Sequence, residues 1–310
     1  MVRFVGVVAC AVALLFPGWA GLRSAPSASG EPTSPRGKRT PPPTEPITEE
    51  AFVPFVSARA RTESRSRHAP PPTGPRQVLL TFDDGPELST TPLVLQELDR
   101  YGIKAVFFVA GRRLMGHTPG AIARRRLLAQ ISQSGHLVAN HTVHHNDLCS
   151  DKTQIDYEID HTQRLITRTI GYAPKLFRPP FGSTCGALEQ ALDSRHMRAV
   201  GWTIDPQDWR RQSPDKVAAF VIDRLQNMGS RAVVLLHDTH LTGPQALPQI
   251  LAFIDDERAR AARGEVRPLE VVGPSVLLPS GDLPPSTLAP VASDLAQNVA
   301  SVSDLLGLVP

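Results

Sequence analysis

The chain has 310 residues, of which 41% are hydrophobic and 20% charged, as in an ordinary globular protein. Three Cys exclude a small disulfide-dense scaffold, and 22 Gly without a repeating period exclude a collagen-like rod. The net charge is +3, and residues 21–77 alone hold nine Lys or Arg against five Asp or Glu. The remainder shows no basic stripe with interleaved aromatic residues, so nucleic acid is not expected as a partner.

The first 20 residues have the pattern of an export signal. Arg3 precedes an apolar run from Val5 to Phe16, which has the length of a signal-peptide core and is short for a membrane span. Gly18 and Ala20 supply the small residues of a cleavage site after Ala20. We therefore predict a signal peptide over 1–20 and a secreted or cell-envelope protein with no stable membrane partner beyond export. An uncleaved anchor is the alternative.

Residues 21–77 are rich in Pro, Ser and Arg, and hold 12 of the 30 Pro. Such a segment cannot bury enough apolar surface to offset the loss of conformational entropy, so it predicts a disordered, semi-extended linker. At the other end, residues 280–310 lack a strong pattern and are predicted to be a tail.

Short apolar runs alternate with helical patterns between these two segments. The predicted strands are Val78–Phe82, Ala105–Val109, His136–Asn140, Leu176–Arg178, Ala199–Ile204, Ala232–Leu236 and Leu269–Val272. The predicted helices between them are Thr91–Tyr101, Ala121–Ser134, Thr153–Ile170, Ala187–Arg195, Pro214–Asn227 and Pro244–Ala262. Strands this apolar are buried on both faces, so the pattern predicts an α/β fold with a parallel sheet covered by helices. A barrel and a doubly wound open sheet both fit.

Polar residues cluster directly after five of the predicted strands. These segments are Asp83-Asp84-Gly85-Pro86, His141 to His145, Arg178 to Gly182, Asp205 to Trp209, and His237-Asp238. Because the carboxyl ends of parallel strands meet at one edge, we expect these side chains to lie close together. Two imidazoles and a carboxylate can form an open divalent-metal site, and a second carboxylate, an Arg and a further His remain for acid–base chemistry.

The five segments resemble, in order, the five motifs of the polysaccharide deacetylase family, also called the NodB-homology domain or carbohydrate esterase family 4. The resemblance covers roughly residues 78–273, and Phe181 stands where the family more often has Tyr. It implies a distorted (β/α) barrel of about seven parallel strands in a single catalytic domain, which we place at 78–279.

By position, the resemblance implies that Asp84, His141 and His145 bind a divalent metal. Zinc is the first choice, with cobalt or another divalent ion as the alternative, because ligand type narrows the metal without fixing it. The partner implied is an acetylated glycan substrate. Nothing in the sequence indicates the oligomeric state.

The resemblance also implies the acid–base residues. Asp83 is the general base for the attacking water, and Arg178 holds Asp83 ionised and oriented. His237 is the general acid for the leaving amine, and Asp205 supports the charged imidazole of His237. Asp208 is interpreted only as a cap of the loop before Trp209.

Three further residues are implied to contact the substrate. Trp209 and Leu235 line the acetyl pocket, and the backbone N–H of Phe181 stabilises the oxyanion. Cys149 and Cys185 each lie a few residues beyond a motif, and in an exported protein they are free to form a disulfide or to remain thiols.

These inferences lead to one function and two alternatives. The first is a metal-dependent deacetylase that removes N-acetyl groups from an N-acetylglucosamine-containing polysaccharide of the peptidoglycan or chitin type. The second is an O-acetyl esterase acting on xylan or another acetylated glycan, because the same site serves an ester. The third is a glycan-binding module without catalysis, which the presence of every implied catalytic residue disfavours.

Overall fold

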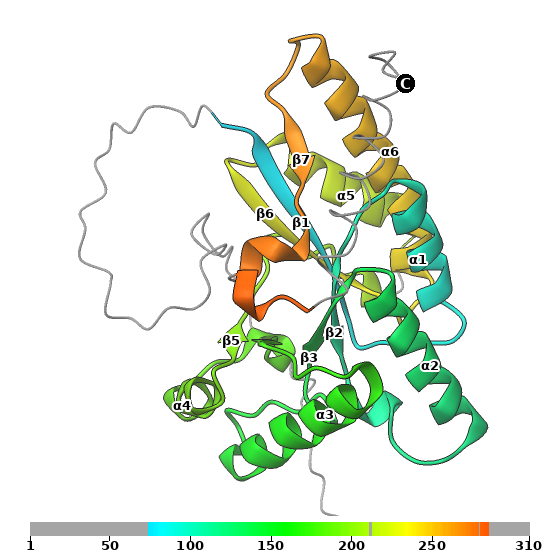
Figure 1. The fold of residues 1–310 in the computed structure, drawn as a ribbon. Coiled ribbons are helices and arrows are strands. Elements are labelled where there is room, and N and C mark those ends of the chain that lie inside the picture. Colours follow the sequence, from blue (N-terminus) through cyan, green and yellow to red (C-terminus); the bar gives the residue numbers. More distant parts are fainter. Residues whose placement is uncertain (1–73, 211–212, 279, 285–310) are drawn as a thin grey trace, which may run out of the picture. The chain divides into compact units, whose positions relative to one another are not determined.

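The computed structural model describes residues 74–210, 213–278 and 280–284 (Figure 1). The predicted signal peptide lies outside these residues, as do most of the predicted linker and most of the predicted tail. The strands are β1 (Arg76–Asp83), β2 (Val106–Val109), β3 (Leu137–Asn140), β4 (Leu176–Phe177), β5 (Arg198–Ala199), β6 (Arg231–His237) and β7 (Leu269–Val271). The α-helices are α1 (Thr91–Arg100), α2 (Pro119–Gln133), α3 (Ile155–Ile170), α4 (Gly186–Ser194), α5 (Pro214–Gln226) and α6 (Thr242–Ala262).

The seven strands form one parallel sheet. Its order is β5-β4-β3-β2-β1-β6, and β7 pairs with the start of β1. Beyond β5 the chain crosses to the free edge of β6, where Ile204 forms a parallel bridge with Val234. The bridge brings the segment after β5 to the far edge of the sheet, and the structure confirms a distorted (β/α) barrel that this single bridge closes only in part.

Alternating side chains of each strand face the barrel interior and the surrounding helices. In β1, Val78, Leu80 and Phe82 belong to a core that includes residues of α1, α2, α5 and α6. Leu79 belongs instead to a second core, which contains residues of the other strands and none of these helices. This period of two is the one expected for barrel strands. It also places the side chains of Thr81 and Asp83, which lie two residues apart in β1, on the inner face of the barrel.

The helix boundaries follow from local sequence. Thr118 and Ser213 cap α2 and α5 by accepting the backbone N–H of the residue three positions on, and a Pro follows each cap. Gly171 ends α3 in the left-handed region, with φ 85°. The helices surround the strands, and α5 contacts α6, α2 contacts α3 and α1 contacts α6 (Figure 1). Within the ranges the structure describes, no helix combines the length and apolarity of a membrane span.

One predicted strand is much shorter than expected. The sequence predicts Ala199–Ile204, but only Arg198 and Ala199 pair with β4. Ile204 instead pairs with β6, on the other side of the closure. Val200 and Gly201 lie between these two pairings. Their backbone carbonyls accept hydrogen bonds from Arg178 and are therefore not available to pair with a neighbouring strand.

The predicted boundaries of the linker and the tail also shift. The linker was placed up to residue 77, but β1 begins at Arg76, whose buried guanidinium pairs with Glu257. Beyond β7, the buried side chains of Leu277 and Leu278 join the interior core, and Leu283 packs against that core. Of these residues, Arg76 lies in the predicted linker and Leu283 in the predicted tail, and both pack with the barrel.

Candidate active site

The five polar segments lie at the carboxyl ends of the strands, as the parallel topology requires. Asp83 ends β1, His237 ends β6 in register with it, and Asn140 ends β3 directly before His141. Arg178 follows β4 directly. Asp205 to Trp209 follows the Ile204 bridge. The structure thus gathers these residues at one mouth of the barrel.

Asp84, His141 and His145 form a candidate metal site. One donor atom from each residue lies within 4.8 Å of the other two. The Nε2 atoms of both imidazoles are 3.7 Å from Oδ1 of Asp84. That oxygen is buried and has no hydrogen-bond partner among the described residues. Because an unpartnered buried carboxylate oxygen is costly, its convergence with two ring nitrogens fits a bound cation.

The electrostatics of these ligands agree with that fit. A carbonyl oxygen only accepts hydrogen bonds, so Nδ1 of His141 donates to the carbonyl of Arg178 at 2.8 Å, and Nε2 is the ring nitrogen that faces Asp84. Burial lowers the pKa of His145 to about 4, assisted by His141, so its ring is neutral near pH 7. Burial raises the pKa of Asp84, but nearby His141, His145 and His237 lower it further than burial raises it. Two imidazoles and a carboxylate form a donor set suited to zinc-like ions.

The loop that carries the two imidazoles is held by a buried residue that the sequence did not reveal. Glu158 of α3 accepts the backbone N–H groups of Val143 and His144 at 2.7 and 2.8 Å through one oxygen. Its other oxygen lies 2.7 Å from Nδ1 of His144. His144 itself is exposed, as expected for a residue between two ligands. No pattern in the sequence connects a helix residue to a loop 14 positions earlier.

Replacing Glu158 with Ala leaves these donors without an acceptor inside the protein. Because each unsatisfied buried donor costs about 1–3 kcal/mol, we expect the free energy of unfolding to fall by about 2–4 kcal/mol. We also expect zinc affinity to fall by about 10–100-fold, the usual effect of removing a group that orients metal ligands. Urea denaturation and zinc titration measure the two effects. The exposed Glu189 of α4 gives the control, and an equal loss in Glu189→Ala would contradict the prediction.

Arg178 connects the barrel interior to the first carboxylate of the site. Its fully buried guanidinium donates to Oδ1 of Asp83 and to Oγ1 of Thr81, both at 2.8 Å. It also donates to the carbonyls of Val200 and Gly201 at 3.0 and 2.9 Å. Asp83 is thereby fixed in orientation, with its second oxygen 3.6 Å from Nε2 of His141. The contact between Arg178 and Asp83 is the one the resemblance implied.

The carboxylate that supports His237 is Asp208, and the expectation for Asp205 is wrong. Oδ1 of Asp208 lies 2.7 Å from Nδ1 of His237, and its Oδ2 accepts the His237 backbone N–H at 2.8 Å. Burial lowers the pKa of His237, but the hydrogen bond to Asp208, with the charges of Asp208, Asp83 and Asp84, raises it to about 9. His237 is therefore protonated near pH 7.

Local geometry explains the exchange between the two aspartates. Asp205 accepts the backbone N–H of Gln207 at 2.8 Å, and Gln207 adopts a φ of 54°. This tight turn directs Asp208 into the protein, where it is fully buried. Gly243 allows the close approach, because a Cβ there would lie 2.3 Å from Oδ2 of Asp208. Asp208 is thus far more than the loop cap that the sequence suggested.

The three residues expected at the substrate occupy different environments. Phe181 is 68% exposed with a φ of 59°, and its ring meets that of His145 edge-on at 4.7 Å between centroids. Trp209 is 42% exposed and stacks under the guanidinium of Arg210. Leu235 is buried in the interior core. Phe181 lies beside the candidate metal site, whereas no described contact links Trp209 or Leu235 to that site.

Cys149 and Cys185 form a disulfide, with their Cα atoms 5.8 Å apart. Each lies four residues beyond a residue of the mouth, namely His145 and Phe181. The bond therefore links the loops that follow two of the five motifs.

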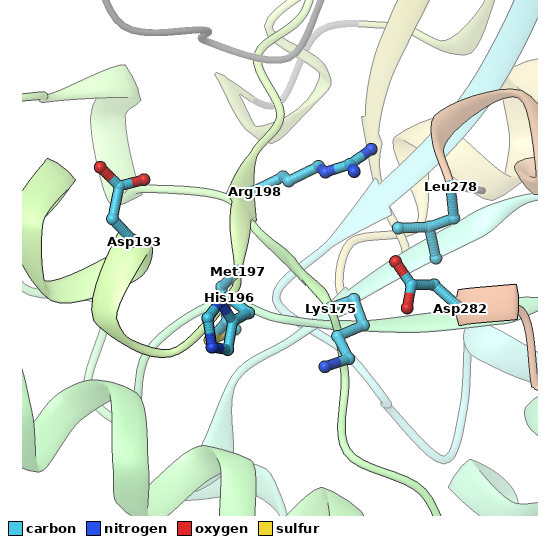
Figure 2. A pocket seen from close by; sticks show the side chains of 7 residues that line it. All are labelled: Lys175, Asp193, His196, Met197, Arg198, Leu278 and Asp282. Carbon is cyan, nitrogen blue, oxygen red and sulfur yellow. The ribbon is translucent and has the colours of Figure 1, made fainter.

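One cavity lies away from this mouth. It has a volume of about 450 Å³ and is lined by residues near the amino ends of β4 and β5 and by the segment after β7 (Figure 2). Figure 2 shows Lys175, Arg198 and His196 together with Asp193 and Asp282 around it. None of the residues expected in the site lines this cavity.

Comparison with known proteins identifies this arrangement. The polysaccharide deacetylase family profile matches residues 71–200. A peptidoglycan-N-acetylglucosamine deacetylase of Bacillus cereus is 32% identical over 61% of this chain and 67% of its own length. A chitooligosaccharide deacetylase of a Bradyrhizobium species is 33% identical over 63% of this chain and 82% of its own length. The deacetylase PgdA of Listeria monocytogenes is 33% identical, but the chain spans only 36% of its length.

Solved structures agree with these relatives. The Bc1960 peptidoglycan N-acetylglucosamine deacetylase has 29% identity and a TM-score of 0.56 over 67% of this chain and 90% of its own. An acetyl xylan esterase from Clostridium thermocellum, solved with cobalt, has 29% identity and a TM-score of 0.54 over 65% and 90%.

The fold, the site and these similarities define a hydrolase of the carbohydrate esterase type on a (β/α) barrel. More narrowly, the chain belongs to the polysaccharide deacetylase family.

Proposed function

We propose that the chain is a metal-dependent enzyme that removes N-acetyl groups from an N-acetylglucosamine-containing polysaccharide of the peptidoglycan or chitin type. The observation that carries the proposal is the convergence of Asp84, His141 and His145 beside two further groups, a fixed carboxylate and a protonated imidazole. The names of the relatives support the substrate class, since they act on peptidoglycan or chitooligosaccharides.

Asp84, His141 and His145 would hold the metal, with zinc as the first choice for a set of two nitrogens and one oxygen. A divalent cation bound there polarises the acetyl carbonyl and lowers the pKa of a coordinated water molecule. The similarity to an enzyme solved with cobalt keeps cobalt as an alternative.

The chain's own residues then divide the proton transfers. Asp83, held by Arg178, takes the proton from the attacking water, because its carboxylate is fixed and is not part of the ligand set. His237 gives its proton to the departing amine nitrogen, and Asp208 keeps the ring charged and oriented until that step. The backbone N–H of exposed Phe181, beside the ligand His145, donates to the oxygen that becomes negative. Trp209 and Leu235 remain proposed neighbours of the acetyl group.

We also propose that the protein acts outside the cytoplasm. The disulfide between Cys149 and Cys185 supports this location, because such bonds persist in oxidising compartments. The signal-like residues 1–20 and the Pro-rich segment that follows them fit export to a target in the cell wall. The catalytic domain proposed at 78–279 would then lie beyond this spacer.

A panel of acetylated glycans tests the function. We expect acetate release from peptidoglycan or N-acetylglucosamine oligomers, a loss of more than about 90% with chelator, and recovery with added zinc. Release from acetylated xylan alone would replace the proposal with an O-acetyl esterase. Binding without metal-dependent release from any glycan would replace it with a non-catalytic module.

A further inference from the structure

Asp238 is a fully buried carboxylate that the proposed mechanism does not use. It follows His237 directly, at the end of β6. Among the described residues it forms no ion pair with a Lys or Arg, and its Oδ1 has no hydrogen-bond partner. Burial, with a smaller contribution from the charge of Asp84, raises its pKa to about 7. A group this costly to bury calls for a reason.

The carboxyl group packs against the backbone of the first motif. A Cβ placed on Gly85 would lie 2.1 Å from Oδ2 and 2.3 Å from Oδ1 of Asp238. The carboxyl group therefore occupies the space where any other residue at position 85 would carry its side chain. Gly85 follows the proposed metal ligand Asp84 directly.

Two hydroxyl groups extend this contact along the same loop. The Thr90 hydroxyl donates to the backbone carbonyl of Asp238, and the Thr91 hydroxyl donates to its Oδ2. The Thr91 hydroxyl also accepts the backbone N–H of Glu87 at 2.8 Å. Asp238 thus contacts the start of the loop at Gly85 and its end at Thr90 and Thr91.

From these contacts we infer that Asp238 is a positioning residue that joins the loop of Asp84 to the strand end of His237. It sets the position of the proposed acid relative to the proposed metal site. The inference rests on the proposed function for the roles of Asp84 and His237. The contacts themselves are properties of the chain.

Asp238→Ala removes both the packing against Gly85 and the Thr91 acceptor. We expect kcat to fall by about 10–100-fold with KM changed by less than about threefold, because geometry in the transition state is disturbed more than binding. We expect zinc affinity to fall by about tenfold, as when a group that orients a ligand is lost. Asp238→Asn keeps the size of the side chain and an acceptor oxygen. Its kcat and its zinc affinity should both stay within about threefold of the wild-type values.

Glu257 provides the matched control, because it is also a buried acid but pairs with Arg76 at the opposite end of β1. Glu257→Ala should lower the melting temperature while leaving kcat and zinc affinity within about twofold, measured well below the transition. If Asp238→Ala behaves like Glu257→Ala, with stability lost and kcat and zinc affinity kept, the positioning role is wrong.

A double-mutant cycle tests the contact directly. Gly85→Ala forces a methyl group against Asp238, so we expect kcat and zinc affinity to fall by about tenfold or more. Asp238→Ala opens that space, so the combined loss in the double variant should be at least about threefold smaller than the product of the two single losses. Losses that simply add would overturn the inference.

The zinc titrations separate this inference from the proposed function. If the wild type releases no acetate from any glycan, the proposed function fails. The zinc affinities of the wild type, the two single variants at positions 85 and 238 and the double variant would still measure the coupling between these two positions. If the wild type is active and zinc affinity shows no coupling between positions 85 and 238, the inference alone fails.

Discussion

Asp83→Asn is expected to lower kcat for acetate release by about 10²–10⁴-fold while zinc still binds. Asparagine has the shape of aspartate and can still accept the hydrogen bond from Arg178, but it cannot take a proton from water. The substitution therefore removes the proposed base and leaves the proposed ligands in place. Initial rates and a metal analysis of the purified variant measure the two effects.

Asp84→Asn is the matched control for this experiment, because Asp84 is the neighbouring carboxylate and belongs to the ligand set. We expect this variant to lose zinc affinity together with activity. An Asp83→Asn enzyme that keeps full activity with its metal bound would remove Asp83 from the role of base. An Asp83→Asn enzyme that loses its metal would make Asp83 a ligand instead.

Asp208→Asn is expected to lower kcat by about 10²–10⁴-fold and to shift the pH profile. The hydrogen bond and charge of Asp208 help to raise the pKa of His237 to about 9. His237 can act as the proposed acid only while its ring is protonated. Wild-type activity should therefore decline as the pH rises through about 9. Without the Asp208 charge the pKa falls, and the basic limb of the profile moves to lower pH.

Asp205→Asn distinguishes the structure from the sequence-based expectation. Asp205 contacts the backbone of Gln207 rather than the ring of His237, so its replacement should cost less than about tenfold in kcat. It should also leave the basic limb near its wild-type position. If Asp205→Asn moves that limb and Asp208→Asn does not, the assignment from the structure is wrong.

The sequence predicted the order and type of every strand and helix in the barrel, because each has its own hydrophobic period and its own end signals. It also placed Asp84, His141 and His145 at one mouth, because parallel strands share an edge. Most predicted boundaries differ from the observed ones by one or two residues, whereas Ala199–Ile204 is misjudged most in extent, since its apolar pattern does not show that the chain changes partner strand within it.

The exchange of Asp205 and Asp208 has a different physical origin. Both are acidic residues in one irregular segment, and the positive φ of Gln207 decides which one turns inward. Neither hydrophobic periodicity nor motif spacing encodes that choice. The role of Glu158 and the contacts of Asp238 were not predicted for a related reason, since their partners lie in distant loops and their burial is visible only in three dimensions.

Arg178 has a consequence for how this enzyme tolerates change. The same guanidinium fills the barrel interior, holds the backbone where the sheet closes, and aims Asp83. Lysine has a single nitrogen on a flexible stem and cannot reproduce that fork. A substitution at position 178 would therefore change the stability of the barrel and the orientation of Asp83 at the same time. Evolution could not alter one of these properties there without the other.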